Sequence, residues 1–431
     1  MHLRALFNKY RSSDEVRSVA TYTFANFFNK GLSFLMLFYF ANVLTQSDFG
    51  MLSLFNNSIL FLMPFVSLGI LQSVNTDFFK LSNFEFRNFL TSAIVLPIIV
   101  TVASALFLFV FKQNLKAQYA LPYFFAWLIP ALALMGFLNE LLFILFRNNL
   151  QANNYLVAHI LRLIIEIAIA VILIKFFQLG WLSRVTGVAI SFFVIAAYAV
   201  FYLMRGKYLG GQLQVGYIKG ELIFSLPVMA LQLGVFSLSA SAVYFLQHFT
   251  KNLAEVGVYS VAATFGSIVN VFCVALLQYA QPNLYKLLSA SIPDFKAIRR
   301  QLVWYIVAMA VSTILVIVLV PLAYMILLDP GYQKGLSYYY LICLGQFCWS
   351  IAYLFCSFLL YYKLKKRLML FSLAAIALSV IFNYWLIGQW QSKGAALACF
   401  LSNAGVLLLI FLIVKKQIIP ILQGKAIVQT S

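Results

Sequence analysis

Seven ionisable side chains stand inside or at the edge of long apolar runs, and they are the residues of this chain best suited to chemistry. They are Lys30, Glu140, His159, Arg162, Glu166, Arg184 and His248. A charged group at the centre of a membrane span costs about 2.5–3.5 kcal/mol on insertion scales, so such groups usually face a cavity or a partner. These seven residues therefore mark candidate binding sites.

Lys30 lies in the middle of the apolar run 19–41, too far from either end for its ammonium group to reach water easily. Asn26, Asn29 and Ser33 recur beside it at helical spacing and form one polar stripe with it. We expect this stripe to line a cavity in which Lys30 meets an anionic part of a ligand. The alternative is a buried ion pair of Lys30 with Glu140 or Glu166.

A second polar face lies in the run 154–174, where His159, Arg162 and Glu166 share one side of a helix. Arg162 and Glu166 are four residues apart and could form a purely structural ion pair. Glu140 is expected at a similar depth, as a second partner of Arg162. Both carboxylates are candidates for ion coupling or for pairing with the cations, and Arg184 near the outer end of the next run is a further candidate cavity residue.

Other kinds of chemistry find little support in the sequence. The chain has no Walker loop, no GxSxG, no HExxH and no pair of carboxylates exposed to water, while His2, His159 and His248 are too scattered for a metal site. The five cysteines fall inside apolar runs without a CxxC pair. We therefore expect no enzyme, no cofactor and no metal centre.

The elements that must position these residues are set by composition. Hydrophobic residues make up 64% of the chain, charged residues only 10%, and the mean hydropathy is +0.95. A soluble domain has about 25% charged residues. The chain is therefore expected to lie in a bilayer as an all-α polytopic protein.

Crossing about 30 Å of hydrocarbon takes about 20 apolar residues in a helix. Twelve windows of that kind occur in the sequence, which predicts twelve transmembrane helices. They lie near 19–41, 51–73, 89–111, 120–145, 154–174, 182–204, 222–247, 256–280, 302–327, 336–362, 368–388 and 394–414.

Most lysines and arginines fall into alternate loops and into the two ends of the chain. Because cytoplasmic loops collect these residues, both termini are predicted to be cytoplasmic. The same distribution accounts for the net charge of +19, which suits anionic lipid headgroups. Nucleic acid is not an expected partner.

The chain shows signs of an internal duplication. Asp48-Phe-Gly-Met-Leu-Ser53 matches Glu255-Val-Gly-Val-Tyr-Ser260, and Gly187-Val-Ala-Ile-Ser191 matches Gly394-Ala-Ala-Leu-Ala398 at the same offset. Asn139 and Gln346 keep that offset too. We expect two six-helix lobes, 1–204 and 222–431, related by a parallel repeat and joined by a glycine-rich, flexible cytoplasmic linker at 205–221. The alternative is that similar hydrophobic spans match by chance.

The second half keeps polarity but loses charge. At the repeat offset Lys30 corresponds to Ser237, Arg162 to Met369, Glu166 to Leu373 and Arg184 to Gln391. The seventh span instead carries four polar residues on one face. We expect this face to line a shared cavity that prefers anionic, hydroxyl-rich cargo; its residues are Ser237, Ser241, Tyr244 and His248.

Several short motifs resemble the multidrug/oligosaccharidyl-lipid/polysaccharide exporter superfamily. They are Leu44-Thr-Gln-Ser-Asp-Phe-Gly50, Leu226-Pro227, Val256-Gly-Val-Tyr-Ser260 and the glycine-led span openings at 187 and 394. In their order and spacing the chain is most similar to the polysaccharide-transport branch, the Wzx-type O-antigen flippases.

The resemblance implies a V-shaped, two-lobed transporter of the bacterial cytoplasmic (inner) membrane. Its cargo would be an undecaprenyl-pyrophosphate-linked oligosaccharide, moved from the cytoplasmic to the outer leaflet by alternating access. Membrane lipids and other polysaccharide-assembly proteins are the further partners it implies. Many relatives carry an Asp towards the end of the seventh span, whereas the segment 241–248 has no acid here. An ion-coupling role would therefore fall to Glu140 or Glu166.

Two other functions are weighed against this one. A drug/cation antiporter of the same superfamily needs an acidic or aromatic cavity, and Lys30 argues against it. A polysaccharide polymerase or ligase needs a substantial outer loop for its chemistry, and the outer loops of this chain are short.

Overall fold

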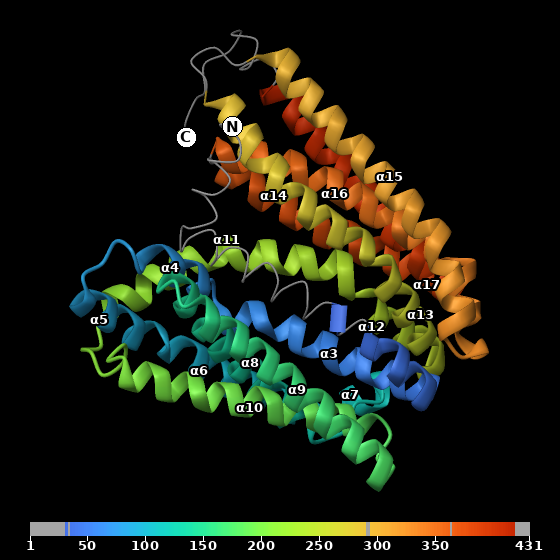
Figure 1. Ribbon diagram of the computed structural model, residues 1–431, viewed down its shortest axis with the longest axis horizontal. Helices are drawn as coiled ribbons and strands as arrows, with labels where there is room; N and C mark the ends of the chain where they lie inside the picture. The colour runs from blue at the N-terminus through green and yellow to red at the C-terminus, as the bar shows by residue number, and fades with distance from the viewer. Residues whose placement is uncertain (1–30, 33–34, 290–293, 363, 419–431) are drawn as a thin grey trace, which may run out of the picture. The chain divides into compact units, whose positions relative to one another are not determined.

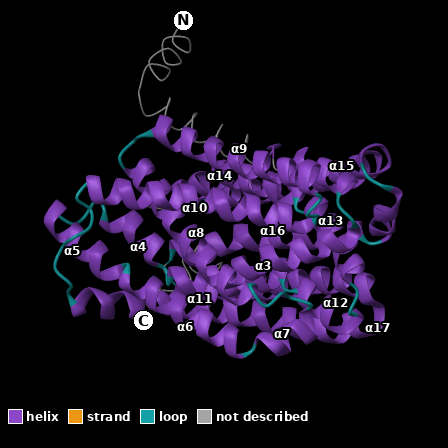
Figure 2. Cartoon of the chain, turned by 90° about the horizontal axis from the view of Figure 1, so that it is seen from below, coloured by secondary structure: helices purple, strands orange, loops and turns teal. Residues whose placement is uncertain are grey.

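The computed structural model describes residues 31–32, 35–289, 294–362 and 364–418, and this part of the chain consists of helices joined by short loops (Figures 1 and 2). The first apolar run, 19–41, falls largely outside the described residues. Asn26, Asn29, Lys30 and Ser33 are among those not described, so the polar stripe around Lys30 stays a prediction.

The helices differ widely in length. Some apolar runs are divided between two shorter helices, whereas α17 continues across a kink and joins two helices into one. In chain order they are α3 (Gln46–Ser67), α4 (Ile70–Asp77), α5 (Asn83–Ala93), α6 (Val95–Val110), α7 (Lys112–Tyr119), α8 (Phe125–Asn148), α9 (Ala152–Phe177), α10 (Trp181–Arg205), α11 (Val215–Ala240), α12 (Ala242–Thr250), α13 (Leu253–Gly266), α14 (Ile268–Leu288), α15 (Phe295–Leu327), η1 (Pro330–Ser337), α16 (Tyr339–Tyr361), α17 (Lys365–Ile413) and η2 (Val414–Ile418).

Among the described residues, nine helices are long and apolar enough to cross a membrane, or ten if the bent pair Val215–Leu222 and Pro227–Ala240 counts as one span. The longest, α17, is two helices that meet at Gln391, whose backbone has φ 50° and ψ −126°. Every predicted window from 51–73 onward overlaps one of these helices. The chain is thus an all-helical multi-pass membrane protein.

The chain divides into two compact units, and α3 and α11 pass from one to the other. Unit 1 contains residues up to Thr45 and Phe55–Met229, and unit 2 contains Gln46–Leu54 and the residues from Ala230 onward. Within unit 1, α10 packs along α9 and α8. A buried aromatic and aliphatic cluster fills the space between these three helices, formed by Leu142, Phe143, Phe146, Tyr155, Ala158, Ile195 and Ala199.

The loop 206–214 after α10 is hydrogen-bonded to α5, although its glycines predicted a flexible linker. Arg87 Nε donates a hydrogen bond to the carbonyl of Leu209 (2.8 Å), and the backbone N–H of Gln212 donates to Asn88 Oδ1 (2.8 Å). The backbone N–H groups of residues 211 and 214 donate to the hydroxyls of Thr91 and Ser92. These four α5 side chains share one helix face, so they hold a loop that the glycine content alone would leave free.

Within unit 2, the first turns of α3 cross α13 at backbone contact. A Cβ added to Gly50 would collide with the Leu253 carbonyl, and a Cβ added to Gly257 would collide with the Gln46 carbonyl. One turn further on, the hydroxyl of Ser260 donates to that of Ser53 at 2.7 Å, across a sequence separation of 207. Only glycine allows two helices to approach this closely.

Candidate functional site

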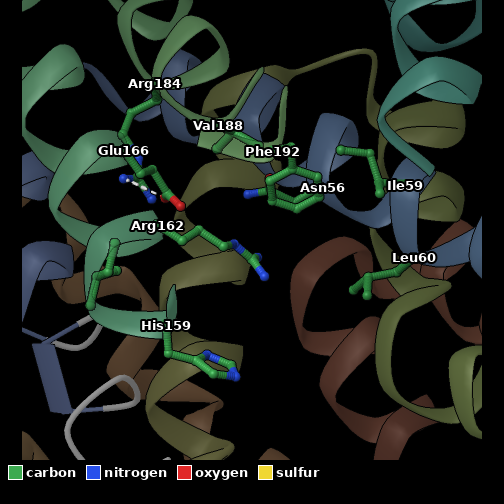
Figure 3. A pocket seen from close by; sticks show the side chains of 10 residues that line it. Asn56, Ile59, Leu60, His159, Arg162, Glu166, Arg184, Val188 and Phe192 are labelled. Atoms are coloured by element: carbon green, nitrogen blue, oxygen red, sulfur yellow. Dashed lines mark ion pairs between the residues drawn. The ribbon is translucent and has the colours of Figure 1, made fainter. Parts of the chain in front are cut away.

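A cavity of about 330 Å³ lies within unit 1, between one face each of α3, α9 and α10 (Figure 3). It combines charged and apolar side chains. Its lining residues are Asn56, Ile59, Leu60, His159, Arg162, Leu163, Glu166, Arg184, Val188 and Phe192.

The helical period places these side chains together. Arg184, Val188 and Phe192 recur every four residues on α10, so they line one side of the cavity. Gly187 lets α10 approach α9, since a Cβ there would lie only 2.5 Å from the Glu166 carbonyl oxygen. The close approach brings the side chain of Arg184 within reach of the Glu166 carboxylate.

Glu166 forms an ion pair between helices. Its Oε1 lies 3.0 Å from Nη1 of Arg184 (Figure 3), and the two side chains are only 13% and 22% exposed. The intrahelical pair of Glu166 with Arg162, which their spacing allowed, is not formed. Sequence spacing could not reveal this, because the partner that Glu166 takes comes from the neighbouring helix.

Arg184 also contacts the segment before α3. Its guanidinium lies 4.5 Å from the centroid of the Phe40 ring, which is 2% exposed. Arg184 therefore joins α9, α10 and the end of the first apolar run through one charge pair and one cation–π contact. This arginine holds the wall of the cavity together.

Arg162 has a different environment. Its guanidinium stacks on the Phe192 ring at 4.3 Å from the centroid, and Gly136 of α8 makes room for that ring. Within the described residues no carboxylate lies within ion-pair distance of Arg162, although Glu166 and Glu140 act on it electrostatically. Its N–H donors are thus held in place by the aromatic contact and remain available to a ligand.

Glu140, expected as the second partner of Arg162, lies on α8 and does not line the cavity. The charges of Arg162 and Arg147 both act on its carboxylate. Its predicted role as a charge partner or an ion-coupling residue stays a prediction.

His159, one of the seven ionisable residues that the sequence singled out, is a cavity residue. Its ring stacks on Phe143 at 3.8 Å with an interplanar angle of 18°, and the Tyr155 ring lies 4.4 Å away. The ring lines the cavity one turn from Arg162. Its position three residues before Arg162 places the two side chains on the same face of α9, as the sequence predicted.

The four candidate residues of the second half lie in unit 2. Ser237 and Ser241 are buried, and the Ser237 carbonyl accepts hydrogen bonds from the hydroxyls of Ser241 and Ser379, both at 2.6 Å. Tyr244 donates to the Leu54 carbonyl at 3.4 Å, and His248 packs against Phe249. None of the four lines the cavity of unit 1.

Comparison with known proteins places the chain in a transporter fold. Over 90% of this chain and 94% of the other, it superposes on a multidrug resistance MATE family transporter of the MOP superfamily in an inward-facing conformation, with a TM-score of 0.73 and 14% identity. It superposes on the lipid II flippase MurJ in an inward closed conformation with a TM-score of 0.69 and 15% identity, covering 94% of this chain and 90% of MurJ. At these identities the likeness shows the fold.

The sequence itself identifies the family. No curated protein matches the chain. Residues 16–287, more than half of the chain, match the family described as polysaccharide biosynthesis protein. The chain therefore belongs to this polysaccharide biosynthesis protein family.

Proposed function

We propose that this protein is a flippase that moves a polyprenyl-pyrophosphate-linked oligosaccharide, an O-antigen or related repeat unit, from the cytoplasmic to the outer leaflet. The transporter works by alternating access in the bacterial inner membrane, with both termini cytoplasmic. Its twelve transmembrane helices form two six-helix lobes, 1–204 and 222–431, related by a parallel repeat.

The observation that carries the proposal is the environment of Arg162. Among the described residues its guanidinium has no ion-pair partner, and it is fixed on an aromatic ring beside an apolar wall. Such a group binds phosphate strongly, because charge-assisted hydrogen bonds gain strength away from water. With Arg184 neutralised by Glu166, the lining keeps one net positive charge. That charge favours an anionic cargo over the cationic drugs of a multidrug exporter.

The crossing of α3 and α13 supports the repeat. Gly50 and Gly257 correspond at the same offset as the hydrogen-bonded pair Ser53 and Ser260, which is 207. Contacts between equivalent residues are what a pseudo-two-fold axis produces, since residue i then meets j where j meets i.

The proposal is tested by complementation. In the host lacking this gene, Arg162→Ala is expected to lower surface glycan at least about tenfold, because one charge-assisted hydrogen bond contributes about 1.5–3 kcal/mol. Lys30→Ala is expected to act in the same direction. Met369→Ala, at the position that corresponds to Arg162 in the second half, is the matched control and should leave the glycan unchanged.

If the Arg162→Ala and Lys30→Ala variants fold and still support the normal amount of surface glycan, the assignment of these two residues to a substrate cavity is wrong. Resistance to cationic dyes on overexpression, without any effect on glycan, would favour a multidrug exporter instead.

Alternating access is tested at Ser53 and Ser260, whose hydroxyl oxygens are 2.7 Å apart. If α3 must move away from α13 at this crossing during transport, a disulfide between Ser53→Cys and Ser260→Cys should stop transport, and reductant should restore it. Each single cysteine variant is the control. Undiminished transport by the fully cross-linked protein would contradict the alternating-access mechanism.

A further inference from the structure

We propose that His159 binds the sugar of the cargo beside the phosphate that Arg162 holds, and so gives the cavity its preference for a glycosylated over a bare prenyl pyrophosphate. The inference rests on the proposed function and assigns one part of the cargo to one residue. It concerns the wall formed by His159, Arg162 and Glu166 on α9.

The imidazole is held in one plane. The Phe143 ring lies parallel to it at 3.8 Å, and the Tyr155 ring closes a second side at 4.4 Å. Phe143 and Tyr155 both belong to the buried core cluster of unit 1. The ring is therefore positioned by rigid packing, as a binding residue needs to be.

Neither ring nitrogen has a hydrogen-bond partner in the described part of the chain, although both are screened from solvent. Buried polar atoms are nearly always hydrogen-bonded, so two unpartnered nitrogens on one side chain call for an explanation. The ring also lines the cavity. A 180° rotation about χ2 keeps the plane against Phe143 and exchanges the nitrogen and carbon edges of the ring. A cargo group in the cavity can thus meet a nitrogen without breaking the stack.

The hydrogen-bonding capacity of the ring identifies the part of the cargo. A neutral imidazole has one N–H donor and one nitrogen acceptor. A phosphate offers acceptors only and would leave the acceptor nitrogen unpaired. A sugar hydroxyl both donates and accepts, so it can pair with either nitrogen, whichever one the ring turns towards the cavity.

The spacing along α9 fits this division of the cargo. Arg162 lies one turn from His159 on the same face, and Figure 3 shows both side chains extending into the cavity. Glu166 lies one turn beyond Arg162, but its carboxylate is held by Arg184. A phosphate on Arg162 therefore has the imidazole as its polar neighbour on the side away from that ion pair.

The test measures binding of two probes to the purified full-length protein by calorimetry in micelles. One probe is a short-chain prenyl pyrophosphate, and the other is the same molecule carrying one hexose. Wild type should bind the glycosylated probe about tenfold more tightly, as expected for one or two hydrogen bonds. His159→Phe, which keeps the aromatic stack, should lose this preference and leave the affinity for the bare probe unchanged.

His159→Asn restores one donor and one acceptor and should recover part of the preference. Asn154→Ala, an exposed position on α9 whose amide donates to Gln151, is the matched control and should behave as wild type. Equal binding of both probes by wild type, or an equal loss for both probes in His159→Phe, would overturn the assignment of His159 to the sugar.

Arg162→Gln separates this inference from the proposed function. It should weaken both probes equally while the hexose preference persists. If Arg162→Gln changes neither affinity, the phosphate assignment fails and the role of His159 is judged by the hexose preference alone. If wild type binds neither probe, the proposed cargo and the role of His159 are both wrong.

Discussion

Two polar groups inside the helices of this protein, one in each compact unit, differ in kind. Unit 1 has the charged cavity around Arg162 and Glu166. Unit 2 has an uncharged cluster in which the hydroxyl of Ser241 lies 3.2 Å from that of Ser379, and the amide of Asn383 donates to both. At the repeat offset, Arg162 and Glu166 correspond to Met369 and Leu373, which are 44% and 49% exposed.

The difference lies in which polar groups find partners within the protein. In unit 2 the hydroxyls of Ser241 and Ser379 both donate to the Ser237 carbonyl and both accept from the amide nitrogen of Asn383, as polar groups with a structural role do. Only the amide oxygen of Asn383 has no hydrogen-bond partner among the described residues of this cluster. In unit 1, the described residues leave Arg162 without an ion pair and His159 without a hydrogen bond. Violations of local rules are expected at functional sites, so the charged group of unit 1 is where cargo is expected to bind.

The largest expected effect on stability comes from giving unit 1 the residues of the second half. Glu166→Leu leaves the guanidinium of Arg184 in an apolar wall without its carboxylate, and Arg184→Gln leaves the carboxylate unpaired. Breaking a buried pair costs about 3–5 kcal/mol. Because both side chains are partly exposed, each single variant should lose about 2–3 kcal/mol, measured by thermal unfolding in detergent.

The double variant Glu166→Leu with Arg184→Gln carries the two residues that stand at these positions in the second half. It removes both charges together, so it should lie within about 1 kcal/mol of wild type. If the double variant instead loses the sum of the two single losses in stability, the ion pair between Glu166 and Arg184 makes no contribution of its own.

A smaller effect is expected where each half turns into its last long helix. Gly180 precedes α10 with φ 54° and ψ −132°, and Gln391 interrupts α17 with nearly the same angles, φ 50° and ψ −126°. This conformation suits glycine and strains other residues. Gly180→Gln should therefore lower stability by about 1–2 kcal/mol, and Gln391→Gly should raise the unfolding temperature. An unchanged or lower unfolding temperature for Gln391→Gly would mean that Gln391 makes a compensating contact.

The two turns also show what the sequence could and could not predict. Apolar windows located the long apolar helices among the described residues, because the bilayer sets their length. The short α7 (Lys112–Tyr119) lies between two windows and was not predicted. The repeat offset pairs Gln391 with Arg184, whereas the matching turn is at Gly180, one helical turn earlier. A hydropathy pattern cannot reveal this shift of the turn by one helical turn within an apolar helix.

The sequence predicted the part of the candidate site that depends on one helix and missed the part that depends on contacts between helices. The helical period put His159, Arg162 and Glu166 on one face of α9, and the cavity contains all three. That Glu166 pairs with Arg184 and that Arg162 stacks on Phe192 depends on the packing of α10 against α9 at Gly187. Such contacts between helices leave no pattern in a single sequence.

The smallest effect is expected from Ser379→Ala in the uncharged cluster of unit 2. The variant removes the 2.6 Å hydrogen bond to the Ser237 carbonyl, but Ser241 still donates to that carbonyl at 2.6 Å. Asn383 also keeps its bond to the Ser241 hydroxyl. The substitution therefore takes the last hydrogen-bond partner from no further group, and the loss of stability should be about 1 kcal/mol or less, with transport at the wild-type level. A Ser379→Ala variant that unfolds at the wild-type temperature yet transports poorly would place cargo or a coupling ion in unit 2. The contrast between a charged binding site and an uncharged structural cluster would then no longer hold.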